Sequence, residues 1–106
     1  MASSTTKYRQ SLLEALSDPT EASAYLNAAL EDSPEAFLKA LGNVAQANQM
    51  ARIARDAGVQ RETLYRSLSE HGNPTFATLT SILGALGMKL TITAVEERKR
   101  DTVASR

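Results

Sequence analysis

The pattern of apolar and polar positions predicts five to six helices in succession. Apolar residues recur three or four positions apart, as they do on one face of a helix. Asp18-Pro19 and Ser33-Pro34 each combine an N-cap residue with a favoured first helical residue, so they mark two helix starts. A first helix is predicted over 8–16, two more start at Pro19 and Pro34, and three follow over about 49–57, 61–69 and 76–86.

We expect the apolar stripe of each helix to be buried and the acids of the second helix to face outward. The predicted stripe of the second helix is Ala22, Tyr25, Leu26, Ala29 and Leu30. Gly42 interrupts the third helix at a cost of about 1 kcal/mol relative to alanine, which is consistent with a close helix contact there. Thr75 is the expected N-cap of the last helix, and glycines separate the later helices.

The periodicity changes after Gly87. Apolar Met88, Leu90, Ile92 and Ala94 alternate with Lys89, Thr91, Thr93 and Val95, and this period of two predicts a short β-strand over 88–95. No other strand is predicted, and an open strand edge is costly. We therefore expect this strand to pair with its copy in a homodimer, or alternatively with a sheet edge of another protein; the homodimer is favoured.

Length and composition limit the class of protein. With 106 residues, the chain suits one domain, expected over 8–95, with a disordered N-terminus (1–7) and a charged flexible tail (96–106). No apolar run is long enough to cross a membrane, and no secretory signal is expected at the N-terminus. The absence of cysteine excludes disulfides and thiolate metal sites, and we expect a cytoplasmic protein.

The charges are segregated although the net charge is zero. Six acids and no base lie between Gln10 and Leu38: Glu14, Asp18, Glu21, Glu31, Asp32 and Glu35. Five bases against two acids lie between Lys39 and Arg66. Because salt screens charges over about 10 Å, a local basic surface, here one that includes Arg52, matters more for phosphate contact than the net charge, although charge alone gives only modest support for DNA binding.

The segment 50–68 carries the candidate chemistry. Two short helices that cross steeply need a small residue where they touch, which Ala54 supplies, and a turn that tolerates positive φ, which Gly58 supplies. Six residues of the second helix then face outward: Gln60, Arg61, Glu62, Thr63, Tyr65 and Arg66. Such donors and acceptors suit base edges and phosphates in a major groove about 12 Å wide. The alternative is a plain helical hairpin with a solvated polar face.

Three segments together resemble the Cro/repressor-type helix-turn-helix. They are Ala57-Gly58-Val59-Gln60-Arg61-Glu62-Thr63-Leu64-Tyr65-Arg66-Ser67-Leu68-Ser69, Gly72-Asn73-Pro74-Thr75 and Ala85-Leu86-Gly87. The segments 24–32 and 34–41 make the chain most similar to the addiction-module antidote proteins, the HigA-like antitoxins. The resemblance covers about 16–93. It implies an all-α, lambda-repressor-like DNA-binding domain with N-terminal additions and a helix-turn-helix at about 49–69.

The resemblance also implies a function. Such a protein binds its own promoter as a dimer, represses its operon and neutralises a small, basic RelE/ParE-like toxin. By the same resemblance, Gln60, Arg61, Glu62 and Arg66 are base-reading, whereas Thr63 and Tyr65 lie nearer the DNA backbone. Met50 departs from the pattern, because many relatives place a phosphate-contacting polar residue there. Asn48 or Gln49 is expected to replace that contact.

Other residues give weaker indications. His71, the single histidine, follows the predicted reading helix, where a C-terminal cap or a phosphate contact is expected rather than catalysis. No ligand set for a metal and no nucleophile–base pair is visible, so we expect neither a cofactor nor an enzyme. Glu31, Asp32 and Glu35 form either a solvated acidic face or the surface that meets a basic toxin. Two other functions remain open: a stand-alone or phage-derived repressor, and a protein-interaction module with vestigial DNA binding.

Overall fold

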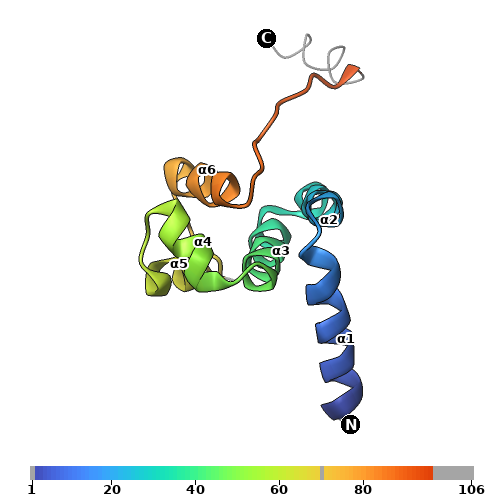
Figure 1. Ribbon diagram of the computed structural model, residues 1–106. Coiled ribbons are helices and arrows are strands. Elements are labelled where there is room, and N and C mark those ends of the chain that lie inside the picture. Colours follow the sequence, from blue (N-terminus) through green and yellow to red (C-terminus); the bar gives the residue numbers. More distant parts are fainter. Residues whose placement is uncertain (1, 70, 97–106) are drawn as a thin grey trace.

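The computed structural model describes residues 2–69 and 71–96, and all regular structure in them is helical (Figure 1). The helices are α1 (Ala2–Leu16), α2 (Pro19–Asp32), α3 (Pro34–Ala47), α4 (Met50–Ala57), α5 (Arg61–Ser67) and α6 (Phe76–Ala85). The prediction of an all-α fold is therefore confirmed for the described residues.

The predicted N-caps hold three of the helices. The hydroxyl of Ser33 accepts a hydrogen bond from the amide of Ala36 at 2.9 Å, and the hydroxyl of Thr75 accepts one from the amide of Thr78 at 3.0 Å. The carboxylate of Asp18 accepts a longer bond from the amide of Glu21 at 3.4 Å. Each bond satisfies one amide that the first helical turn leaves without a partner, so these sequence signals fix where α2, α3 and α6 begin.

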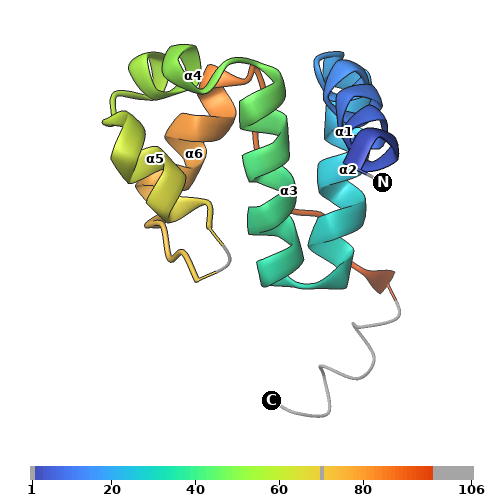
Figure 2. The ribbon, with the colours of Figure 1, turned by 90° about the horizontal axis from the view of Figure 1, so that it is seen from below.

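Helix α3 lies in the middle of the molecule, with α1 and α2 on one side and α4, α5 and α6 on the other (Figure 2). Three of its side chains, Leu41, Val44 and Ala45, are completely buried. A Cβ atom on Gly42 would lie 3.4 Å from the carbonyl oxygen of Leu68, so the glycine does allow the end of α5 to approach α3 closely. The buried residues of the described chain are all apolar.

Two predictions about individual segments differ from the structure. Helix α1 begins at Ala2, so helix extends through 2–7, where we expected disorder. Leu30, expected in the core, is 48% exposed. The reason lies in its neighbours: Leu30 borders open grooves that it shares with Phe37 and Leu90, and these grooves leave part of its side chain in water.

The segment 88–95 forms no strand in the described structure. Gly87 closes α6 with φ 78°, and the amide of Met88 donates to the carbonyl of Leu83 at 2.8 Å. Beyond that bond the chain runs extended away from the helices (Figure 1). Alternation supplies the geometry of a strand but not its partner, and the described chain contains no second strand with which 88–95 could pair. The predicted tail lies outside the described residues from 97 onward.

Candidate functional site

The turn between α4 and α5 has the geometry that its sequence predicts. Gly58 ends α4 in the left-handed region with φ 77°, and its amide donates back to the last turn of the helix. The amide of Val59 donates to the carbonyl of Ala54 at 3.0 Å. Ala54 itself is buried, as expected for a small residue at a helix contact. Three residues, 58–60, therefore connect the two short helices in a fixed geometry.

Helix α5 buries one side chain and exposes most of the others. Leu64 is completely buried and anchors the helix on the core, together with Leu68 just past its end. Gln60, Arg61, Glu62, Tyr65 and Arg66 are exposed, and Thr63 is half-buried. Gln60 occupies the N-cap position but makes no side-chain capping bond. The six predicted site residues of this helix thus lie together, with their functional groups on its surface.

Two of these side chains contact each other. The guanidinium carbon of Arg61 lies 5.9 Å from the centre of the Tyr65 ring, which is one helical turn further along α5. A cation over an aromatic face is attracted by about 0.5–1 kcal/mol at an exposed site. The contact limits the rotamers of Arg61 while leaving its N–H donors available to a ligand.

The basic residues of α4 are partly neutralised. A terminal nitrogen of Arg52 lies 3.5 Å from Asp56, and Nε of Arg55 lies 3.4 Å from the other oxygen of the same carboxylate. Arg52 and Asp56 are one turn apart on an exposed helix, where such a pair stabilises by only about 0.3–0.5 kcal/mol. Arg52 can therefore leave this pair at little cost.

The start of α4 is shaped by three consecutive residues. The side-chain amide of Asn48 donates to the carbonyls of Val44 at 2.8 Å and Leu16 at 3.3 Å, so it ties α1 to the end of α3. Gln49 is exposed and has φ 71°, a positive value that is costly for a residue with a side chain. Met50 is buried, which explains why no polar side chain stands there.

An open groove of about 360 Å³ runs between α3 and α5. Its lining residues are Lys39, Gly42, Asn43, Gln46, Met50, Tyr65, Leu68 and Ser69. Helix α1 reaches the same place through Arg9, whose guanidinium donates to Oδ1 of Asn43 at 3.3 Å and to Oε1 of Gln46 at 2.6 Å. The amide of Asn43 in turn donates to the hydroxyl of Tyr25 on α2 at 2.8 Å. One hydrogen-bonded chain therefore joins α1, α2 and α3 beside the exposed face of α5.

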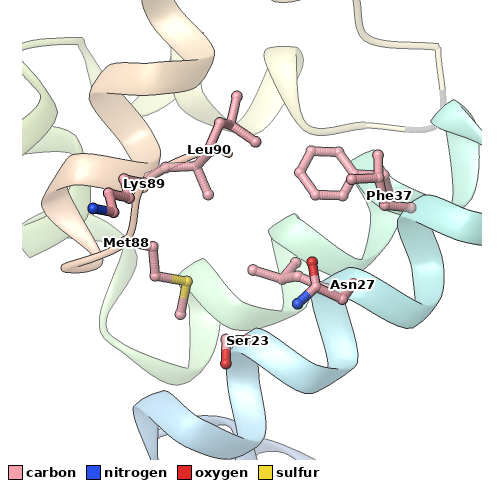
Figure 3. A pocket seen from close by; sticks show the side chains of 9 residues that line it. Ser23, Asn27, Phe37, Met88, Lys89 and Leu90 are labelled. Atoms are coloured by element: carbon pink, nitrogen blue, oxygen red, sulfur yellow. The ribbon is translucent and has the colours of Figure 1, made fainter. Parts of the chain in front are cut away.

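A second, apolar groove lies on the other side of α3, where the chain leaves α6. Figure 3 shows Met88 and Leu90 of the extended segment facing Phe37 of α3 and Asn27 of α2 across it. Leu90 is 40% exposed, and beyond it Ile92 is 96% exposed. The predicted strand residues therefore start against the helices and then project into solvent.

The acids predicted as a separate surface are exposed. Glu14, Asp18, Glu21, Glu31, Asp32 and Glu35 all lie at the surface of α1, α2 and the first turn of α3. Within residues 2–69 and 71–96, no three acidic or histidine side chains gather in a way that could hold a metal ion. In the same residues, no helix is both long enough and apolar enough to span a bilayer. His71 is exposed beyond the end of α5.

Neither the position of Arg9 nor the groove beside it could be predicted from the sequence. Arg9 lies more than thirty positions before Asn43 and Gln46, the two residues with which it bonds. The spacing of Lys39, Asn43 and Gln46 does place them on one face of a helix, but it does not show which helix packs against that face. The polar contacts between α1 and α3 could therefore be identified only from the structure.

These features define a small protein whose described regular structure is helical, with a glycine-linked helix pair that exposes a polar helix on one side of α3 and with exposed acids on α1, α2 and the first turn of α3. The chain belongs to the family described as "Probable addiction module antidote protein", whose sequence profile matches residues 6–94. It is also 48% identical over 80 residues to an uncharacterized protein of Haemophilus influenzae, a match that covers 74% of this chain and 82% of the relative. No solved structure matches the chain. Membership of this family supports the role of an antitoxin and implies a toxin as its partner.

Proposed function

We propose that this antitoxin is a dimeric, sequence-specific DNA-binding repressor of its own operon that also neutralises a RelE/ParE-like toxin. One observation carries the DNA-binding part: α5 is fixed on the core by Leu64 and presents five exposed long polar side chains at its start and along its surface. A glycine turn is by itself common at helix ends. Here it fixes the position of α5, and a recognition helix needs a fixed position because its side chains must meet base edges in a defined register.

The residues of α5 divide between two tasks. Arg61 and Arg66 carry donors suited to guanine O6 and N7, and Gln60 can donate to and accept from adenine. Thr63 and Tyr65 are assigned to the DNA backbone. Glu62 accepts from cytosine N4. In this proposal α5 is the second helix of a helix-turn-helix and α4 is the first.

Phosphate contacts are assigned to the start of α4. Gln49 is exposed and precedes the first helical amides, which favour an anion. Arg52 lies one turn further and exchanges Asp56 for a phosphate on binding. Asn48 remains in the proposed contact region, although its side-chain amide already donates to the carbonyls of Leu16 and Val44. We therefore assign it the role of positioning the backbone at the start of α4 for the phosphate contact.

Dimerisation is assigned to the segment 88–95. Leu90, Ile92 and Val95 are exposed although they are large and apolar, and the extended chain around them has no strand partner within the described residues. Antiparallel pairing with a second copy would satisfy the backbone groups and bury Ile92. A two-fold dimer would then present two α5 helices to half-sites about one DNA turn apart.

The toxin is assigned to the acidic surface of α1, α2 and the start of α3. Toxins that act on RNA carry positive charge, and opposite charges steer association and contribute to specificity. A solvated acidic face remains the alternative for the same residues. The second candidate function, an interaction module with vestigial DNA binding, is favoured by the buried Met50 and by the pairing of Arg52 with Asp56.

The experiment that separates these functions is a mobility shift with a duplex from the region upstream of the chain's own gene. We expect a shift that weakens steeply as salt rises and is lost in Arg61→Ala and Arg66→Ala. Coexpression with the neighbouring reading frame, followed by a pull-down, tests the toxin. A retained toxin with no DNA shift would favour the interaction module instead.

A further inference from the structure

Beside the groove between α3 and α5, a cation is held in place by two neutral residues that line the groove. Arg9 donates to two amide oxygens, those of Asn43 and Gln46, and within residues 2–69 and 71–96 it pairs with no carboxylate. Amide oxygens orient a guanidinium but do not cancel its charge. Arg52 and Arg55 differ from Arg9 in this respect, because both face Asp56.

The arrangement that orients Arg9 spans three helices. The Asn43 amide donates to Tyr25 on α2, which fixes its oxygen toward Arg9 on α1. A guanidinium has five N–H donors, and these two bonds use only two of them, so the others remain for a further acceptor. Ordering a long side chain before binding lowers the entropy cost of binding. Arg9 is therefore preorganised for a ligand that is negative and accepts several hydrogen bonds.

The groove next to Arg9 suits the same ligand. Its only charged lining residue is Lys39, and hydroxyl or amide groups of Tyr65, Ser69, Asn43 and Gln46 supply further polar atoms. No described acid lines it. Tyr65 also contacts Arg61 on α5, so the groove borders the proposed reading surface directly.

The N-terminal half of α1 projects toward the side of the molecule on which α5 lies, whereas the segment 88–95 leaves on the opposite side (Figure 1). We propose that Arg9 and Lys39 hold a backbone phosphate of the DNA that α5 reads, in the groove between α3 and α5. This inference rests on the proposed function. It extends the DNA contact from the α4–α5 pair to α1 and α3, and makes α1 part of the DNA-binding surface.

The test measures how DNA affinity depends on salt. The logarithm of the association constant falls with the logarithm of salt concentration by about 0.9 for each phosphate neutralised. We expect Lys39→Gln and Arg9→Gln each to make the slope shallower, and the double variant to make it shallower by about 0.9 per protomer in contact, on the upstream duplex and on an unrelated duplex alike. Arg9→Lys keeps the charge and is expected to retain most of the slope.

Arg55→Gln is the matched control, because it removes the same charge from a residue that already faces Asp56 and to which no DNA contact is assigned, so it should leave the slope unchanged. Thermal unfolding of each variant shows whether the fold is retained, and Lys39 makes no hydrogen bond in the described structure that its loss would break. Unchanged slopes for Arg9→Gln and Lys39→Gln, with binding still lost in Arg61→Ala, would overturn the phosphate site alone. An equal loss in Arg9→Gln and Arg9→Lys would show that Arg9 only braces the helices. Absence of any DNA binding by the unaltered protein would instead refute the proposed function.

Discussion

Replacing Gly58 by alanine tests the turn that positions α5. A Cβ atom at this residue would meet no other atom within 4 Å, so the substitution introduces no clash with neighbouring groups. The whole effect therefore comes from the backbone, which has φ 77°. A left-handed conformation costs a residue with a side chain about 1–2 kcal/mol. Alanine also restricts the unfolded chain, which offsets about 0.4–1 kcal/mol.

The expected net loss is about 1 kcal/mol in the free energy of unfolding, or about 4–8 °C in Tm for a domain of this size. Gly84→Ala is the matched control. Gly84 lies within α6, a Cβ there also meets nothing within 4 Å, and its φ is not positive. That variant should be more stable by about 0.5–1 kcal/mol.

Both variants are compared with the unaltered protein by urea and thermal unfolding, followed by far-ultraviolet circular dichroism at one protein concentration, because dimerisation makes Tm depend on concentration. Opposite signs for the two glycines support the turn. If Gly58→Ala were as stabilising as Gly84→Ala, the residue would not be held at positive φ and the described geometry of the α4–α5 pair would be wrong.

Substitutions at three further residues test other parts of the structure. Leu64→Ala should lower the free energy of unfolding by about 2–5 kcal/mol, because this completely buried side chain anchors α5; a loss below 1 kcal/mol would place α5 elsewhere. Gln49→Gly should be at least as stable as the unaltered protein, because glycine tolerates φ 71°, whereas Gln49→Ala should change little; clear destabilisation by glycine alone would argue against the positive φ. Ile92→Lys should leave the helical signal intact but shift sedimentation from dimer to monomer, because Ile92 is 96% exposed in the single chain; an unchanged dimer would exclude the segment 88–95 as the interface.

The helix starts and the turn could be predicted because their causes are local. Ser33 and Thr75 cap amides three residues away, and Gly58 closes a helix through bonds to residues three and four positions earlier. Each signal is contained within a few neighbouring positions. The starts of α2 and α3 were accordingly predicted closely, as were the start and end of α4 and α6 and the buried position of Leu64.

The features that the sequence misplaced, missed or predicted without confirmation depend on distant parts of the chain or on another chain. Leu30 has the spacing of a core residue, but the groove that it borders is completed by Leu90 sixty positions later and stays open. Arg9 acquires its role only because α1 packs beside α3. A strand over 88–95 forms only with a partner strand, and the sequence of a single chain does not show which strand that would be. Periodicity identifies the face that can be buried, and packing decides what covers it.

The most direct test of the central claim is the affinity of the protein for the duplex upstream of its own gene, measured by fluorescence anisotropy for the unaltered chain, Arg61→Ala, Arg66→Ala and the control Arg55→Gln. We expect tight, salt-dependent binding that is lost or reduced at least about fivefold in both α5 variants and retained in the control, since a good bidentate base contact discriminates by about 1–3 kcal/mol. Equal binding by all four proteins, or none by the unaltered chain, would contradict the assignment of α5 as the DNA-reading helix.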